Sequence, residues 1–239
     1  MPVDALGCLH PRVTSSDPVP HSTPSLTPAD AKLGAVTDKR ADLFLTWIRL
    51  IDMYTLDRAR KDLTQDELDF EPHPGAWGIR PRGEHRTKHA GGDESGQWVV
   101  ECDWDLANDQ FQGKPVVMPM TTINWLLNHF GAAPGLFADL DIVGGPNTPT
   151  QEIYGRMWGH TIIPTVEEGL ARFNDGWAAL KEALKTTTDE MLERDYPGHP
   201  WRRGDHALAA MLNEVSHHGT QICMVRDIYA NRFGTTRQR

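Results

Sequence analysis

Glu214 and His218 are four residues apart in the stretch "NEVSHHGTQI", residues 213–222. On a helix this spacing places both side chains on one face, about 40° apart. Apolar residues flank the stretch at helical spacing, so both polar groups fall on the face that is expected to be buried. A carboxylate is costly to bury unless it is paired or binds a metal. The spacing therefore predicts either two ligands of one metal ion or a buried Glu–His pair, with or without a core arginine that completes it.

The spacing alone is a weak signal, because short motifs recur by chance. The other histidines at this spacing lie beside prolines or in a Gly-rich stretch, where helical geometry does not apply. They are the acidic–His pairs Asp17/His21, Asp69/His73 and Asp195/His199, and the pair His85/His89. Only Glu214 and His218 lie on a segment with convincing helical periodicity.

His129 is a candidate third ligand, near the end of another helical segment, "TTINWLLNHFG". Facing helices of a bundle project side chains inward, so ligands from two helices can meet. Two imidazoles and one carboxylate suit Zn²⁺ or another divalent ion and leave coordination positions open. The alternative for His129 is a core histidine that is satisfied by hydrogen bonds. His217 falls on the other side of Glu214 and is expected to support the site or to pack against a neighbouring helix.

Four long segments carry the helical periodicity that would position these residues. They begin at about Asp38, at Thr121 or Thr122, after the capping pair Thr165/Glu168, and at about Asp205. The second is expected to stop at Gly131–Gly135 and the fourth at about Ala230, and a shorter helix is indicated at 150–160. This pattern predicts an all-α fold, a four-helix bundle.

Two segments differ from the helices. Residues 1–37 are rich in Pro, Ser and Thr, which predicts a flexible N-terminal extension before a domain at 38–239. Residues 63–117 are dense in Pro and Gly and predict a long irregular insertion, with one strand-like piece at Trp98–Val100. In the first helix, the expected apolar face consists of Leu43, Trp47, Leu50, Ile51 and Tyr54.

The composition narrows the classes of function. The net charge is −9, from 24 basic and 33 acidic residues, which disfavours nucleic acid as a partner. No apolar run approaches the roughly 18 residues of a membrane span, and no secretory signal is seen. The three cysteines have no disulfide or metal spacing. We therefore expect a cytoplasmic protein, with a homodimer as the default assembly.

The segments "TTINWLLNHFG", "NEVSHHGTQICMVRDIY" and "PGAWGIRPRG…WVVECDWD" together resemble the DinB-like superfamily. These metal-binding four-helix bundles include the YfiT-like and mycothiol-dependent maleylpyruvate isomerase groups. The resemblance covers about residues 38–235. The family pattern is a His near the end of the second helix, then His-xxx-His or Glu-xxx-His on the fourth. It implies that His129, Glu214 and His218 are the metal ligands, as in the Glu-bearing branch.

The resemblance implies that the bound ion activates a low-molecular-weight thiol such as mycothiol, bacillithiol or glutathione. Zinc is the expected ion, with nickel, manganese, iron and cobalt as alternatives. The metal-bound thiolate would attack a small electrophile, which makes the protein a thiol S-transferase. Gln221 would face the bound sulfur or its water as a catalytic residue. The alternatives are a thiol-dependent cis–trans isomerase of the maleylpyruvate isomerase type and a non-catalytic metal- or ligand-binding stress or accessory protein.

Three arginines are candidate ligands of the thiol cofactor. Arg80 and Arg82 in "GIRPRG" could hold its carboxylates over the mouth of the bundle. Arg226 in "VRDIY" matches a recurring element of the branch that the chain resembles. For Arg226 a salt bridge is the favoured alternative, because ion pairs on helices are common.

Overall fold

The computed structural model describes residues 40–149, 160–196 and 201–234. The chain divides into two units, Met1–Val36 and Thr37–Arg239, and the described residues all belong to the second. The expected N-terminal extension at 1–37 lies outside the described residues, as does almost all of the expected helix at 150–160.

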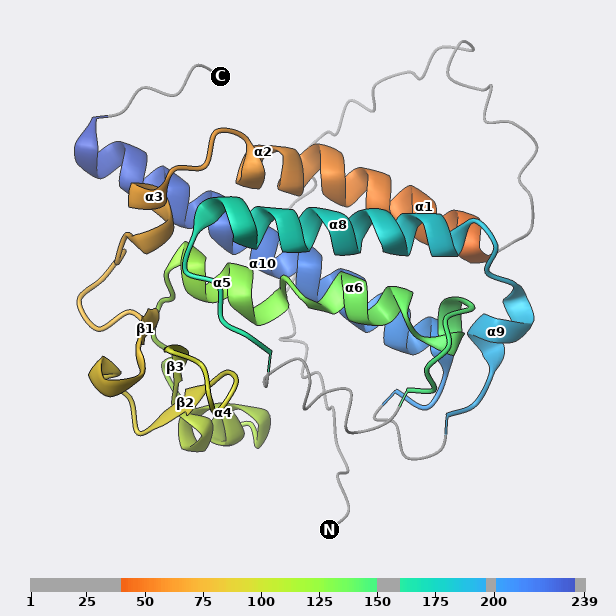
Figure 1. Ribbon diagram of the computed structural model, residues 1–239, viewed down its shortest axis with the longest axis horizontal. Helices are drawn as coiled ribbons and strands as arrows, with labels where there is room; N and C mark the ends of the chain where they lie inside the picture. The colour runs from red at the N-terminus through yellow and green to blue at the C-terminus, as the bar shows by residue number, and fades with distance from the viewer. Residues whose placement is uncertain (1–39, 150–159, 197–200, 235–239) are drawn as a thin grey trace, which may run out of the picture. The chain divides into compact units, whose positions relative to one another are not determined.

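The described domain is mainly helical, which confirms the predicted fold class (Figure 1). Its longest helices are α8 (Val166–Leu184) and α10 (Gly204–Phe233). The first helical segment comprises α1 (Arg40–Ile51), the π-helical turn η2 (Asp52–Leu56) and α2 (Asp57–Arg60). The shorter helices are α3 (Gln65–Asp69), α4 (Trp104–Phe111), α5 (Ile123–Phe130), α6 (Ala133–Ala138) and α9 (Asp189–Glu193), with 3-10 turns η3 (Arg82–Glu84) and η4 (Asp141–Val143).

The second predicted helix is α5, and α6 follows it as a separate helix that was not predicted. Thr122 caps α5, since its hydroxyl accepts a hydrogen bond from the backbone N–H of Trp125 at 3.1 Å. The helix ends at Phe130, with Gly131 as its C-cap. Pro134 then begins the first turn of α6, and its missing N–H prevents it from continuing the hydrogen bonds of α5. The predicted cap at Thr122 and stop at Gly131 are therefore confirmed.

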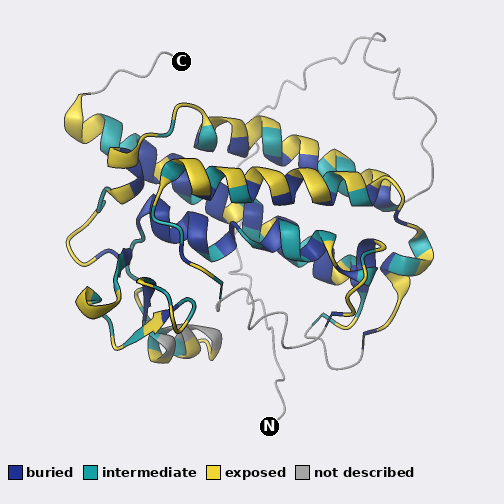
Figure 2. Ribbon diagram, viewed as in Figure 1, coloured by how far each residue is buried: buried dark blue, intermediate teal, exposed yellow. Residues whose placement is uncertain are grey.

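The other two predicted helices follow their apolar stripes. Thr165 caps α8 by accepting from the backbone N–H of Glu168, as its position predicts. The inner face of α8 buries Phe173, Trp177, Leu180 and Leu184. The inner face of α10 buries Leu208, Met211, Leu212, Val215, Ile222 and Val225. The core lies between these helices and α5–α6 (Figure 2), and no described helix is both long and apolar enough to cross a membrane.

The apolar face expected for the first helix is largely wrong. Leu43, Leu50 and Tyr54 are exposed, with relative accessibilities of 69%, 44% and 73%. Of the expected residues, Ile51 is buried and Trp47 is partly buried, and the packed face also contains Ile48, which was not expected there. The segment carries two apolar stripes, and periodicity alone cannot tell which one a neighbouring helix will cover.

The segment at 63–117 is not irregular, which corrects the predicted insertion. It contains a three-stranded antiparallel sheet of β1 (Ile79–Pro81), β2 (His89–Gly91) and β3 (Trp98–Cys102), in the order β1-β3-β2. The strand expected near Trp98–Val100 is confirmed as β3. The other two strands have three residues each, too few to show an alternating pattern in a sequence.

Glu101 joins parts of the insertion through its buried carboxylate and links the sheet to the bundle through its backbone carbonyl. Its carboxylate accepts hydrogen bonds from the backbone N–H of Gly78 at 2.9 Å and from the guanidinium of Arg86 at 3.0 Å. Its backbone carbonyl accepts from the indole N–H of Trp125 on α5 at 2.6 Å. The sheet therefore helps to set the position of Trp125, which lies one turn before His129.

Candidate metal centre

His129, Glu214 and His218 meet where the end of α5 faces the middle of α10. One donor atom from each residue lies within 4.8 Å of the other two. The two imidazoles approach edge to face, with ring centroids 4.7 Å apart and an angle of 87° between the planes. Within the described ranges, no other group of three or more such residues converges in this way.

The three side chains differ in their exposure. The His218 side chain is 10% exposed, whereas that of Glu214 is 47% exposed. His129 is half-buried. An ion held by these residues would contact nitrogen donors from the interior and a carboxylate oxygen at the open side. Two imidazoles and a carboxylate fit Zn²⁺ and related divalent ions, and they leave a coordination position for another group.

The electrostatics keep two of the three ligands in the protonation states that a metal requires. Burial, reinforced by the nearby His218, lowers the pKa of His129 to about 3, so this imidazole is neutral at physiological pH. The hydrogen bond with His218 holds the pKa of Glu214 below its ordinary value, so this group remains a carboxylate. Metal ions bind neutral imidazole and ionised carboxylate.

His218 contacts one polar partner at each ring nitrogen. Its Nδ1 lies 2.7 Å from Oε1 of Gln221, and its Nε2 lies 3.1 Å from Oε2 of Glu214. Because an amide oxygen only accepts, Nδ1 donates its proton to Gln221. The bond to Glu214 requires a proton on Nε2, and a metal ion would take the place of that proton. This bond is also the Glu–His pair of the alternative without a metal, although no arginine of the described residues forms an ion pair with Glu214.

Gln221 is thus placed on the far side of the His218 ring from Glu214. The sequence predicts that Gln221 faces a bound sulfur or water, but its side-chain oxygen instead accepts from His218. Such a partner fixes the tautomer and the orientation of a metal-binding imidazole. This contact places Gln221 where it can orient His218.

Aromatic rings support the two histidines. Trp125 stacks on His129 with ring centroids 4.7 Å apart, and Phe130 stacks on His218 at 5.7 Å. The exposed His217 lies 4.9 Å from His218, measured between ring centroids. The sequence also gives no indication of His160, whose proximity contributes to the low pKa of His129. His160 lies at the end of the helix indicated at 150–160, but no motif connects it with His129, so only the fold reveals its place.

The structure does not bring Arg226 to the metal centre. Its guanidinium is buried and pairs with Glu67, with Nε–Oε1 and Nη2–Oε2 distances of 3.2 Å. It also donates to backbone carbonyls in and after α2, those of Arg58, Ala59 and Asp62. This is the salt-bridge alternative, and it ties α10 to α2 and α3.

Arg82 and Arg80 are also engaged within the protein. Arg82 donates to the backbone carbonyls of Asp93 and Gly96, inside the insertion. Arg80 pairs with Glu71 and lies 3.5 Å from the carboxylate of Glu101. Both guanidinium groups therefore have partners within the insertion or next to it, and neither is in the group of residues that forms the candidate metal centre.

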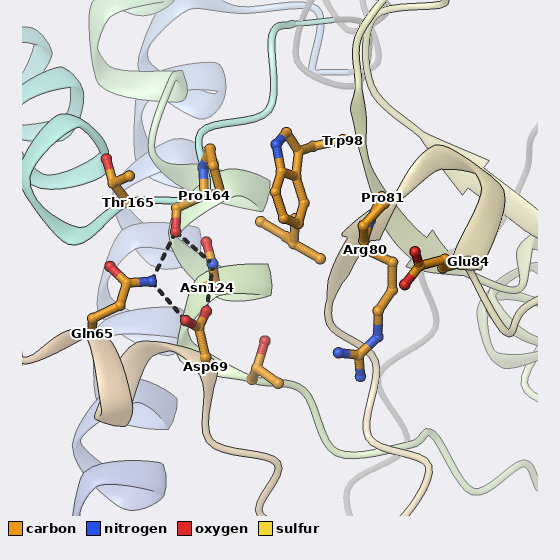
Figure 3. A pocket seen from close by; sticks show the side chains of 11 residues that line it. Gln65, Asp69, Arg80, Pro81, Glu84, Trp98, Asn124, Pro164 and Thr165 are labelled. Carbon is orange, nitrogen blue, oxygen red and sulfur yellow. Dashed lines mark hydrogen bonds between the residues drawn. The ribbon is translucent and has the colours of Figure 1, made fainter.

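Arg80 does line a cavity of about 460 Å³ between the sheet, α3 and the start of α5 (Figure 3). On one side of the cavity, Asp69 accepts from Asn124 at 2.9 Å and from Gln65 at 2.7 Å. Trp98 forms another wall. None of the candidate metal ligands lines this cavity. It lies at the beginning of α5, whereas His129 lies near the end of that helix.

The family comparison agrees with this geometry. The model of the DinB superfamily matches residues 54–222, a range that contains all three candidate metal ligands. No curated protein and no solved structure matches the chain. The family match extends over more than half of the chain and includes all of α5 and more than half of α10. The chain therefore belongs to the DinB superfamily.

Proposed function

We propose that this protein is a metal-dependent enzyme that joins a mycothiol-like, low-molecular-weight thiol, through its sulfur, to a small electrophile. The observation that carries the proposal is the convergence of His129, Glu214 and His218, with donor atoms within 4.8 Å of one another. Membership of the DinB superfamily supports a metal-binding bundle. The partly exposed Glu214 marks the side from which a substrate could enter.

The residues of the site have separable roles in this proposal. His129 and His218 would hold the ion from the interior, and Glu214 would hold it from the open side. When bound, the ion supplies positive charge that favours the thiolate form of a thiol over the thiol itself. Trp125 and Phe130 keep the imidazoles in place by stacking on them. The side-chain oxygen of Gln221 would accept the hydrogen bond from the Nδ1–H group of His218, which leaves Nε2 to face the ion.

The transfer itself forms one bond and breaks one bond. The sulfur donates an electron pair to the electrophilic carbon, and the leaving group departs with the electrons of its bond to that carbon. The thiol proton passes to water at the exposed side of the site. His217 is exposed beside His218 and is available to accept that proton first.

The first experiment measures bound metal. We expect about one divalent ion per chain in the purified wild type and less than about a tenth of that in His218→Ala. His89→Ala is the matched control, because His89 belongs to the insertion and lies outside the converging group. Circular dichroism checks that each variant is folded. Equal metal content in folded His218→Ala and wild type would rule out a metal-dependent function for this site.

The second experiment measures thiol chemistry. Mycothiol, bacillithiol and glutathione are each tested with monochlorobimane, whose chloride leaves when its carbon accepts sulfur. We expect one thiol to be consumed for each fluorescent adduct, with the rate lost after metal removal. Thiol that binds without turnover would favour a non-catalytic protein. Isomerisation of a cis alkene with the thiol returned unchanged would favour the isomerase, and either result would contradict the transferase.

A further inference from the structure

An apolar stripe runs along the outer side of the first helical segment. It consists of Leu43, Trp47, Leu50 and Tyr54, and we refer to these four residues as the α1 stripe. Leu43, Leu50 and Tyr54 are 69%, 44% and 73% exposed, and Trp47 is partly buried. The spacing of four and three residues places Leu43, Trp47 and Leu50 on one face of α1. Tyr54 follows on the next turn, in η2. Figure 2 shows exposed residues along this outer edge of the domain. Contiguous exposed apolar surface of this kind marks an interaction site.

The α1 stripe cannot turn into the core of its own chain. The opposite face of the segment is already buried through Ile48, Ile51 and Leu56. In η2, Thr55 packs so closely against α10 that a Cβ atom added at Gly219 would lie 2.6 Å from its methyl group. The segment is therefore seated on α10 by its inner face, and the stripe is left outside.

We propose that the α1 stripe is the interface of a homodimer in which the first helical segments of two copies pack antiparallel. Its four positions are symmetric about the midpoint between residues 48 and 49. An antiparallel copy therefore places Leu43 opposite the partner subunit's Tyr54, and Trp47 opposite the partner subunit's Leu50. A twofold interface requires this self-complementarity, in which each contact occurs twice.

The charges at the two ends of the first helical segment favour antiparallel over parallel packing of the two copies. The same symmetry places Arg40 opposite the partner subunit's Asp57, and these side chains are 39% and 69% exposed. A parallel arrangement would bring two copies of Arg40 together at one end and two copies of Asp57 together at the other. Like charges in contact oppose association, whereas opposite charges favour it. Arg40 also pairs with Glu193 and Asp205 of its own chain, which holds it at this end of the helix.

Sedimentation of the full-length protein tests the interface. We expect the wild type to sediment with twice the mass of the 26.8 kDa chain. Leu50→Glu places a charge at the centre of the stripe and should weaken the dimer by at least about tenfold. Val117→Glu is the matched control, because Val117 is 91% exposed and lies outside the stripe. Circular dichroism and bound metal show whether each variant is folded.

Two results would overturn the proposal. One is a wild type that remains monomeric at about 100 µM, a concentration at which a dimer of only micromolar affinity would form. The stripe would then be covered by another part of its own chain or by a different protein. The other is a folded Leu50→Glu variant whose dimer is as stable as that of the wild type.

Disulfide trapping tests the antiparallel orientation. Leu43→Cys and Tyr54→Cys are made separately in a Cys8→Ser background, mixed, and oxidised with diamide, which accepts the two electrons and two protons. We expect the main product to join the two different variants, with little product from either variant alone. Products that join each variant to itself would indicate parallel packing, and the absence of any disulfide would contradict the interface.

Discussion

The Nδ1 atom of His218 lies 2.7 Å from the Oε1 atom of Gln221, one turn further along α10. One helix therefore supplies both a candidate metal ligand and the acceptor that fixes its tautomer. Glu214 lies one turn before His218 and contacts the other ring nitrogen. The imidazole is thus held at both nitrogens by side chains of its own helix, and no loop needs to close to orient it.

Loss of the Gln221 acceptor should weaken metal binding without removing a ligand. Gln221→Leu leaves the Nδ1 proton of His218 without its acceptor, and we expect metal affinity to fall by about 10–100-fold. Gln221→Glu retains an acceptor and should retain most of the affinity. Competition with a chromophoric chelator measures the affinity.

Thr220→Val is the control for the Gln221 series. Thr220 is exposed, and its hydroxyl donates to the carbonyl of Ser216, away from the site. Its substitution should leave metal affinity unchanged. If Gln221→Leu binds metal as tightly as this control, Gln221 has no positioning role.

Trp125 should contribute to the stability of the fold through its hydrogen bond and to metal affinity through its stacking on His129. Trp125→Phe keeps a ring next to His129 but loses the 2.6 Å hydrogen bond to the carbonyl of Glu101, which we expect to cost about 1–3 kcal/mol of stability. Trp125→Ala also loses the stacking and leaves a cavity, for a cost of about 3–5 kcal/mol. Urea denaturation measures both values. Metal affinity should fall in the alanine variant and change little in the phenylalanine variant, and equal losses in the two variants would argue against support by stacking.

Arg226 is expected to contribute to stability rather than to thiol binding. Arg226→Met leaves the carboxylate of Glu67 buried without its cation, which should cost about 3–5 kcal/mol. Adding Glu67→Gln neutralises that carboxylate and should recover part of the loss. Under conditions in which the variants are folded, the KM for the thiol should stay at its wild-type value. A large rise in KM in a fully folded Arg226→Met variant would instead place Arg226 in the binding site.

The carboxylate of Glu101 should give part of the acid sensitivity of the fold. Burial by itself would raise its pKa, but hydrogen bonds from Arg86 and Gly78 outweigh burial and hold the pKa below its ordinary value. A lowered pKa in the folded state stabilises the protein above the unfolded value of about 4.3, and this stability is lost as the pH falls through the folded value. We expect Glu101→Gln to cost about 1.5–3 kcal/mol at pH 7.

The difference in unfolding free energy between wild type and Glu101→Gln should therefore shrink as the pH falls below the unfolded value and through the lowered folded pKa of Glu101. Other carboxylates titrate in the same range, but they are common to both proteins and cancel in the difference. Urea denaturation at several pH values measures it. A difference that stays constant across this range would show that the Glu101 charge does not stabilise the fold.

The sequence anticipates features that depend on short-range geometry. The caps at Thr122 and Thr165 are local hydrogen bonds between a side chain and the next turn. The inner faces of α8 and α10 follow from helical periodicity. The insertion was harder to anticipate, because β1 and β2 are each stabilised by pairing with β3, a contact between segments that lie apart in the sequence.

By itself, the sequence determined that Glu214 and His218 share one face of a helix, because a spacing of four residues closely matches the helical turn. Only the tertiary structure decided what that face meets: the packing of α5 on α10 brings His129 to the pair. It also decided that Gln221 contacts His218, that Arg226 is used in a buried ion pair, and that the α1 stripe is exposed. The physical reason is common to these cases, since periodicity defines the faces of a helix but only packing against other segments decides which face is covered.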